Sequence, residues 1–597
     1  MSRKRALEGS GSALAQQEVT AAAIVQRGIT GTTMGDSASI EALARLDAIA
    51  KEIKNQENAR IIAQAIAAIK SRDYAAAEEV ALKVLQRDER SGLAWHILAI
   101  AKEKAGQFAT SMQAYEAALQ LLTDHGPVAG DLGRLAFRMN MPELAAKFFA
   151  HYRVARPDCP EGANNLACAL REINRDQDAI EVLREAILAD PSQHMLWNTL
   201  GTVLCNISDG QGSLTFFDEA LRLAPTFSKG YHNRAFARLD LGDIEGAFAD
   251  CEAAMRNPEN EEDLAMMRFA RATILLAMGR VAEGWEAYDA RFSPALTDAP
   301  RFMINAPLWT GEDLKGKSLM LSAEQGLGDE VMFASILPDV LEALGPEGAL
   351  SIAVEHRLVG LFQRSFPGVE VTAHRTVAQE GRVYRTAPNI EDWSRFDFWA
   401  PIGALLPRFR PSVESFPKRN DYLIPKPDRV AHWKTQLEQA GPGLKVGLLW
   451  KSLKLNAERA RQFSPFHLWQ PVLETAGVTF VNLQYGDCEE EIELARDSFG
   501  VDIWQPQGID LKQDLDDVAA LCSAVDLVIG FSNATINLAG GCGAKIWMLT
   551  GAAAWTRLGT DSYPWYPNTR CFVTERYGAW EPTMDAIALA LSELVAA

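Results

Sequence analysis

Cysteine is scarce in this chain, and long apolar runs are absent. The 597 residues include eight cysteines without a C-x-x-C pair, a usage typical of reduced, buried thiols in a reducing compartment. No stretch of about 18 consecutive apolar residues occurs, so we predict no transmembrane helix. The start, MSRKRALEGSGSALAQQ, has three basic residues but no apolar core after them, so we expect no signal peptide. These absences predict a cytoplasmic protein.

Positive charge is also in short supply. Lys and Arg number 59 against 78 Asp and Glu, which gives a formal net charge of −19. General nucleic-acid binding needs a basic surface, so the charge argues against it. The sequence lacks a Walker A lysine loop, a G-x-S-x-G elbow and a His/Cys/Asp cluster with metal-ligand spacing. We therefore expect no ATP hydrolysis, no bound metal and no cofactor.

The residues that are present predict several domains. Hydrophobic residues make up 48% of the chain, and a chain of this length exceeds a single core. Residues 1–39 are rich in Ser, Gly, Thr and Ala without a stable period, so we expect a flexible tail. Apolar residues in the region 40–292 follow helical spacing, which predicts a helical domain.

A 34-residue repeat runs through this helical region. One position recurs at that spacing and is followed each time by a small residue, and further small residues and closing prolines recur later in each unit. The recurring pairs are Leu98 with Ala99, Leu132 with Gly133, Leu166 with Ala167, Leu200 with Gly201 and Arg234 with Ala235. Small residues let two antiparallel helices pack closely, and the pattern resembles the tetratricopeptide repeat. We count about six or seven repeats, which would stack into a superhelix with a concave groove.

Side-chain amides recur near one position of the first helix of each repeat. They are Asn164, Asn165, Asn198 and Asn233. Amides in a groove can hold an extended peptide through its backbone without reading its sequence, so these four residues are candidates for binding an acceptor protein. The alternative is a solvated helix face.

The rest of the chain has a different pattern. Residues 293–317 contain three prolines and predict a connector laid over the next domain, on which we also expect the last repeat, with Trp285 and Tyr288, to pack. Short apolar runs then alternate with helical segments, which predicts parallel sheets with helices on both faces. The runs are Ser318–Ala323, Leu350–Val354, Val369–Thr372, Phe396–Ala400, Lys445–Trp450, Thr479–Leu483, Leu527–Ile529 and Lys545–Leu549. They divide into halves at 318–430 and 431–597, so the whole chain is of the α + α/β class.

One strand–turn–helix stretch organises the first half. The run SLMLSA is followed by EQGLGDE and then by helical spacing from Val331. The glycines Gly326 and Gly328 would let a ligand approach backbone N–H groups at the helix start. Asp329 and Glu330 lie at the same place, where they either cap the helix or meet a ligand. A second stretch of this kind, Asp526–Thr550, would face the first across a cleft.

Loops of the second half carry the candidate donor-binding residues. In parallel sheets, ligands bind beyond the carboxyl ends of the strands. The candidates are Lys451, Ser452, Gln484, Tyr485, Ser532, Asn533, Ala534 and Thr535, with Lys454, Arg459 and Arg461 as further basic residues of the Lys451 loop. Basic side chains and a helix N-terminus suit a nucleotide phosphate. The alternative for each basic residue is an ordinary solvated loop.

These motifs resemble a known enzyme family. QGLGDE before a helix resembles the N-terminal motif of GT-B glycosyltransferases of the heptosyltransferase type, and DLVIGFSNATINLAGGCGAKIWMLT with the later YPWYP resembles their donor segment. The resemblance covers about residues 300–597 and implies a GT-B fold of two doubly wound α/β halves, with the acceptor side first and the donor side second. Those relatives usually carry Asp and His where this chain has Ser532 and Asn537, so the donor contacts would differ.

The fusion of repeats to such a domain resembles protein O-glycosyltransferases, and most closely the flagellin glycosyltransferases of the FlmG type. This resemblance implies metal-independent transfer of a nonulosonic acid, such as pseudaminic acid, from its CMP-activated form to Ser or Thr of flagellin. It assigns the general-base role to Asp329 and flagellin binding to the repeats. Two alternatives stay open: a glycosyltransferase acting on a lipid or polysaccharide, and a non-catalytic tetratricopeptide scaffold.

Overall fold

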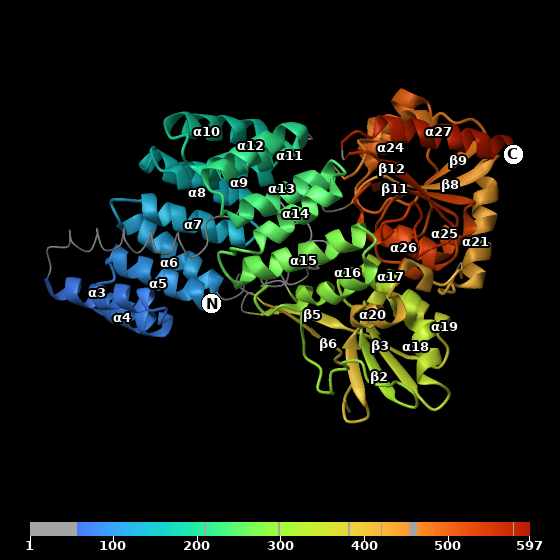
Figure 1. Cartoon of the computed structure of the whole chain (residues 1–597), viewed down its shortest axis with the longest axis horizontal. Helices are drawn as coiled ribbons and strands as arrows, with labels where there is room; N and C mark the ends of the chain where they lie inside the picture. The colour runs from blue at the N-terminus through green and yellow to red at the C-terminus, as the bar shows by residue number, and fades with distance from the viewer. Residues whose placement is uncertain are drawn as a thin grey trace, which may run out of the picture. The chain divides into compact units, whose positions relative to one another are not determined.

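The computed structural model divides into two compact units (Figure 1). One ends at Asn233 and the other runs from Arg234 to Ala597. The predicted tail and the predicted start of the repeat region, residues 40–55, lie outside the described residues. The described residues are 56–207, 210–296, 299–379, 382–419, 421–452, 462–576 and 578–597.

Helical hairpins build the N-terminal unit and continue past its end, as the 34-residue period predicts. Seven pairs of antiparallel helices occur among the described residues, coloured blue to green in Figure 1. The pairs are α3 (Gln56–Lys70) with α4 (Tyr74–Arg87), α5 (Gly92–Lys104) with α6 (Phe108–Leu121), α7 (Gly126–Arg138) with α8 (Pro142–Ala155), α9 (Pro160–Glu172) with α10 (Asp176–Ala189), α11 (His194–Asn206) with α12 (Gly210–Leu223), α13 (Ser228–Asp240) with α14 (Ile244–Ala254), and α15 (Glu261–Ala277) with α16 (Val281–Tyr288).

Close packing explains the small residue of each first helix. A Cβ atom on Gly133 would lie 2.5 Å from the ring of Phe149, and one on Gly201 would lie 2.7 Å from the ring of Phe217. Both distances are far inside van der Waals contact, so a larger residue would force the paired helices apart. The period in the sequence therefore records a steric requirement.

The last hairpin packs into the α/β region, as expected for Trp285. The Trp285 Nε1–H donates to the carbonyl of Arg410 at 2.9 Å, and its ring meets the edges of Trp555 and Trp565. Gly559 lies so close to Gly279 that a Cβ on Gly559 would be 2.5 Å from the Gly279 nitrogen. The compact unit therefore begins at Arg234, well before the connector, because the last helices share an apolar core with the sheets.

Two parallel sheets make up most of the α/β region, coloured yellow-green to red in Figure 1. Their orders are β4-β3-β2-β7 and β12-β11-β10-β8-β9, and all neighbouring strands are parallel. The strands are β2 (Ser318–Ser322), β3 (Ala349–Val354), β4 (Glu370–Ala373), β7 (Phe398–Pro401), β8 (Leu444–Leu449), β9 (Val478–Asn482), β10 (Leu527–Phe531), β11 (Ile546–Gly551) and β12 (Thr569–Thr574). Each of the eight predicted apolar runs overlaps one of these strands, which confirms the α/β prediction, and β12 is a further strand that was not predicted.

Helices connect and cover the sheets, which is why strands such as β10 and β11 are buried along their whole length. The α-helices of this region are α17 (Leu327–Phe333), α18 (Leu337–Leu344), α19 (Val359–Ser365), α20 (Leu406–Phe409), α21 (Pro427–Gln439), α23 (Gln470–Leu473), α24 (Glu489–Phe499), α25 (Leu515–Ala524), α26 (Ala534–Gly541) and α27 (Glu581–Ala596).

A small third sheet was not predicted. Its order is β1-β6-β5, from β1 (Arg301–Phe302), β5 (Arg375–Gln379) and β6 (Arg382–Thr386). The hairpin strands β5 and β6 have no apolar run: β5 is exposed or half-buried along its length, and β6 alternates buried with less buried residues, one of the buried ones being Arg385. The connector contributes β1, which pairs with β6.

The predicted boundary between the α/β halves needs a correction. The division at 430/431 falls inside α21, which is one continuous helix. Arg429 makes two hydrogen bonds of 2.7 Å to Asp517 on α25, and Trp433 Nε1–H donates to the same carboxylate at 3.0 Å. The whole of α21 therefore packs with the second half.

Candidate functional site

The turn between β2 and α17 is fixed by two carboxylates. Glu324 is fully buried, and Arg291 donates to its two oxygens through Nε and Nη2, both at 2.9 Å. The backbone N–H of Gly403, just after β7, donates to the same carboxylate at 2.7 Å. At the other end of the turn, the Gly326 N–H donates to Asp329 Oδ2 at 3.0 Å. Arg291 follows the last repeat hairpin, so the helical region helps to hold this turn.

The two neighbouring acids of the GLGDE motif have different surroundings. Glu330 is 2% exposed, lies 2.7 Å from His374 Nε2 through Oε1, and accepts from the Glu355 N–H at 2.8 Å through Oε2. Both of its oxygens therefore hold neighbouring segments together. Asp329 is half-buried at the helix start, which makes it the better candidate for contact with a substrate.

The second predicted turn follows β10. Ser532 is exposed, and Asn533 caps α26 by accepting from the Ile536 N–H at 3.0 Å. Asn537 donates to the Asn533 carbonyl at 3.0 Å and accepts from the Tyr566 hydroxyl at 2.8 Å. The helix start thus keeps a fixed shape, with Ala534 half-buried and Thr535 buried behind it.

The two turns meet. A Cβ atom on Gly328 would lie 2.9 Å from Asn537 Nδ2 and 3.4 Å from the backbone nitrogen of Ala534. Only a residue without a side chain permits this approach. The two strand–turn–helix stretches therefore face each other as predicted, but they touch at Gly328 where a cleft was expected. The contact places Asp329 beside the start of α26.

Three buried tyrosines surround this junction. Burial raises the pKa of Tyr288, Tyr563 and Tyr566, and the negative charge of Asp329 raises each pKa further. The three phenols therefore stay neutral at ordinary pH. Tyr288 comes from the last repeat hairpin, and Tyr563 and Tyr566 come from the YPWYP segment.

The strand order places the Ser532 turn where parallel sheets usually bind ligands. In the second sheet, the first strand β8 lies between β9 and β10. The connections after β8 and β10 therefore diverge at a topological switch point, the usual ligand position in such sheets. Lys451 and Ser452 follow β8 at this point. Lys454, Arg459 and Arg461 lie outside the described residues.

The Lys451 loop is tied to its neighbours. Gln484 is 1% exposed, and its Oε1 accepts from the N–H groups of Trp450 and Lys451 at 3.0 and 2.9 Å. Lys451 Nζ pairs with Glu491 on α24 at 2.5 Å. Gln484 thus shapes the loop, and Lys451 would have to leave Glu491 or share its charge to meet a phosphate. Tyr485, next along the chain, is half-buried.

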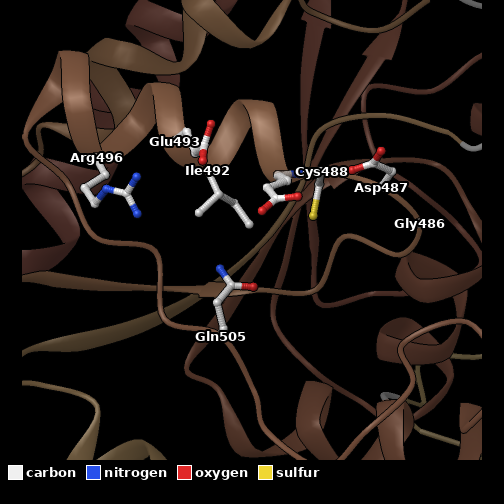
Figure 2. Close-up of a pocket in the computed structure, with 8 residues that line it drawn as sticks. Gly486, Asp487, Cys488, Ile492, Glu493, Arg496 and Gln505 are labelled. Carbon is white, nitrogen blue, oxygen red and sulfur yellow. Dashed lines mark hydrogen bonds between the residues drawn. The ribbon is translucent and has the colours of Figure 1, made fainter.

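A hollow of about 430 Å³ lies next to this loop, between the end of β9 and α24. Figure 2 shows Arg496 and Gln505 on two sides of it, with Asp487 and Cys488 at the chain turn. Acidic side chains outnumber basic ones among its lining residues. The hollow is therefore a poorer place for a phosphate than the start of α26.

The predicted acceptor-binding amides are buried between neighbouring repeats. Asn164 accepts from the Thr199 hydroxyl at 2.5 Å, and Asn198 accepts from Asn233 Nδ2 at 3.0 Å. Asn165 is 0% exposed, and its Nδ2 has no hydrogen-bond partner among the described residues. The alternative of a solvated helix face is therefore wrong. Binding of a peptide by these amides stays a prediction.

The repeat position of Asn164 and Asn198 is a buried histidine in two other repeats, His96 and His232. His96 Nε2 lies 2.5 Å from Asp131 Oδ2, and Arg134 also pairs with Asp131. Burial, helped by the positive charge of Arg134, lowers the pKa of His96 to about 3. Burial likewise lowers the pKa of His232 to about 4. Both imidazoles are therefore neutral in the folded unit.

This neutrality predicts acid sensitivity of the repeats. An unfolded chain protonates these histidines below about pH 6.5, whereas the folded unit does not until the pH approaches the lowered values. The free energy of unfolding should therefore fall with pH below about 6.5, by up to about 1.4 kcal/mol per pH unit for each histidine. Urea unfolding between pH 7.5 and 5 measures the slope. His96→Gln should flatten it, and the exposed control His151→Gln should not; equal slopes in all three proteins would contradict the prediction.

Several site residues were missed by sequence reasoning. Arg291, which holds Glu324, stands in the last repeat, where periodicity assigned only packing roles. Gln325 lies inside the quoted motif but carries no charge or glycine signal. The YPWYP segment was noted, but nothing in it indicated that two of its tyrosines would lie beside Asp329.

The described part of the chain has neither a membrane-spanning helix nor a metal-binding cluster of side chains. No helix there is long and apolar enough to cross a membrane. No group of three or more His, Cys, Asp or Glu side chains is arranged there to hold a metal ion.

Comparison with known proteins finds one relative along the whole chain and tetratricopeptide-repeat matches to part of it. The tetratricopeptide-repeat family profile matches residues 160–193. Over 596 residues the chain is 71% identical to Protein FlbA of Caulobacter vibrioides, and the match covers 100% of both chains. A Protein STIP1 homolog of Dictyostelium discoideum is 30% identical over 99 residues, which cover 16% of this chain and 17% of that one. A solved tetratricopeptide repeat protein from Parabacteroides merdae matches 40% of this chain and 93% of its own, with 16% identity and a TM-score of 0.35.

Proposed function

The chain belongs to the FlbA family, and from this premise we propose that it is a protein O-glycosyltransferase of the GT-B type. It would transfer a sugar from a nucleotide donor to Ser or Thr of an acceptor protein held by the repeats. The resemblance of its motifs to flagellin glycosyltransferases favours flagellin as the acceptor and a CMP-activated nonulosonic acid, such as pseudaminic acid, as the donor.

One observation carries the proposal. Gly328 touches the start of α26. Asp329 of the first half therefore lies beside the helix start of the second half, which is the candidate position for the donor phosphate. Sugar transfer needs both, because a carboxylate must take the acceptor's proton while N–H groups receive the leaving phosphate. A scaffold without activity has no need for this juxtaposition.

The chemistry follows from these positions. The acceptor hydroxyl attacks the anomeric carbon, its proton passes to an Asp329 oxygen, and the bond between that carbon and the phosphate oxygen breaks. CMP leaves with the bonding electron pair. The start of α26, with Ser532 and Asn533, and the neighbouring Lys451 would stabilise the charge on the leaving phosphate. No metal takes part in this scheme.

The repeats would supply the acceptor. Tetratricopeptide hairpins stack into a superhelix whose concave face suits an extended segment of another protein. Holding flagellin here would raise its effective concentration at the transfer site.

The function is tested with purified full-length protein, CMP-pseudaminic acid and purified flagellin. We expect intact-mass spectra of flagellin to gain the mass of the sugar only when all three are present. Modification of a lipid or polysaccharide fraction instead would favour the first alternative acceptor. Flagellin binding without any transfer would favour a scaffold.

Two substitutions test the donor site. Lys451→Ala and Asn533→Ala should each weaken CMP binding by roughly ten- to a hundredfold, because each removes a group that contacts or shapes the phosphate position. Calorimetry with CMP measures the affinity. The exposed Lys545, at the opposite end of the same sheet before β11, provides the matched control Lys545→Ala. Unchanged affinity in both site variants would place the nucleotide elsewhere.

A further inference from the structure

Gln325 has a backbone conformation that its residue type disfavours. Its φ is +66°, in the left-handed region, which is strained for a residue other than glycine. Three of the other non-glycine residues with this geometry, Arg72, Asn140 and Asn174, lie in the turns between paired repeat helices. Gln325 instead lies between β2 and α17, two residues before Leu327 and four before Asp329.

The residues on either side impose this conformation. Glu324 is held by Arg291 and by the Gly403 N–H. Gly326 is held by its N–H donation to Asp329. With both neighbours fixed, Gln325 cannot relax into the ordinary extended or helical region. The turn therefore maintains a strained glutamine where a glycine would fit without cost.

The side chain adds a second cost. Gln325 is 8% exposed, and its Oε1 is buried without a hydrogen-bond partner among the described residues. A buried acceptor that makes no hydrogen bond destabilises the fold, because it has given up its hydrogen bonds to water. Among the described residues, the Gln325 Oε1 makes no hydrogen bond that would offset the backbone strain. Such paired costs are typical of a residue retained for a ligand.

We propose that Gln325 is a specificity-determining residue whose Oε1 accepts a hydrogen bond from a hydroxyl or amide N–H group of the bound substrate. The inference rests on the proposed function and deepens it. The group comes from the donor sugar or from the acceptor hydroxyl, since both must reach the neighbourhood of Asp329. The carbonyl selects substrates that place an O–H or N–H donor at this point, because only these satisfy it.

Gln325→Gly separates this role from a structural one. Glycine removes the side chain and also the backbone strain, so the thermal midpoint of the full-length protein should stay level or rise. Transfer of the CMP-activated sugar to flagellin should nevertheless fall by roughly ten- to a hundredfold in kcat/KM, the effect of one lost hydrogen bond at a buried acceptor. Asn174→Gly is the matched control: it also introduces glycine at a left-handed position, in an exposed repeat turn, and should leave transfer unchanged.

Binding measurements identify the partner of Gln325. If the sugar is the partner, Gln325→Gly keeps the affinity for CMP alone and loses affinity for the CMP-activated sugar. If the acceptor hydroxyl is the partner, the variant keeps its affinity for CMP and for the CMP-activated sugar. Its rate of transfer to flagellin is then lower even when the donor is saturating. Equal transfer by the variant and the wild type would overturn the proposal.

Thermal unfolding of the variants tests the inference even if the wild-type protein transfers no sugar. If the wild type transfers nothing, the proposed function fails, and Gln325 is then judged by unfolding alone. A thermal midpoint lowered by Gln325→Gly and restored by Gln325→Asn would show that the amide serves the fold, which overturns the proposal. A level or raised midpoint would support a ligand role for a site of another activity.

Discussion

Asp329→Asn should abolish sugar transfer, with a loss on the order of a hundred- to ten-thousand-fold in kcat. The carboxylate is the half-buried acid at the meeting point of the two turns, and an amide cannot take the proton of the attacking hydroxyl. Transfer is measured as sugar added to flagellin by intact mass over time. The other acids of the motif, Glu324 and Glu330, are buried and bonded on both sides, so neither is placed to replace it.

The fold should survive this substitution. Asn keeps an oxygen that can accept from the Gly326 N–H, so the turn retains its cap. The thermal midpoint and flagellin retention in a pull-down should match the wild type. The exposed Asp392→Asn is a control with the same chemical change outside the site. Wild-type turnover by Asp329→Asn would contradict the proposal that Asp329 is the general base.

Cutting the chain before residue 300 should leave a C-terminal fragment that is insoluble or unfolded. Residues 300–597 lack Arg291, so Glu324 would be a buried carboxylate without its partner, which typically costs about 3–5 kcal/mol. They also lack Trp285 and Tyr288, which cover the aromatic residues of the α/β core. A fragment of residues 226–597 keeps the last two hairpins and should be soluble and bind CMP.

The longer fragment should still glycosylate flagellin poorly, because it lacks most of the repeats that would concentrate the acceptor. The complementary fragment, residues 1–225, should bind flagellin, since each repeat contacts only its neighbours. The soluble fraction, thermal unfolding and pull-downs with both fragments measure these outcomes. Equal solubility of 300–597 and 226–597 would contradict the packing role of the last hairpin. Flagellin held by 226–597 but not by 1–225 would contradict the recruiting role of the repeats.

The sequence alone determined the two architectures and the pair of turns. The 34-residue period predicts repeat hairpins because a small residue must sit opposite a large one, as Gly133 does with Phe149. The eight apolar runs predict parallel strands because strands covered on both faces must be apolar along their length. The GLGD turn and the stretch after β10 were expected to face each other, and the contact of Gly328 with Ala534 bears this out.

Only the tertiary structure decided which polar residues are still available to a ligand. Glu330 is bonded to His374 and Glu355, Lys451 is paired with Glu491, and Gln484 holds the loop ahead of it. The hydrogen-bond partners of these residues are distant in sequence. A local sequence pattern cannot predict such bonds, because they depend on how distant segments lie in space. The same reason applies to Arg291 and Gln325, because an ion pair across 33 residues and a strained turn arise only when the last repeat hairpin packs against the first sheet.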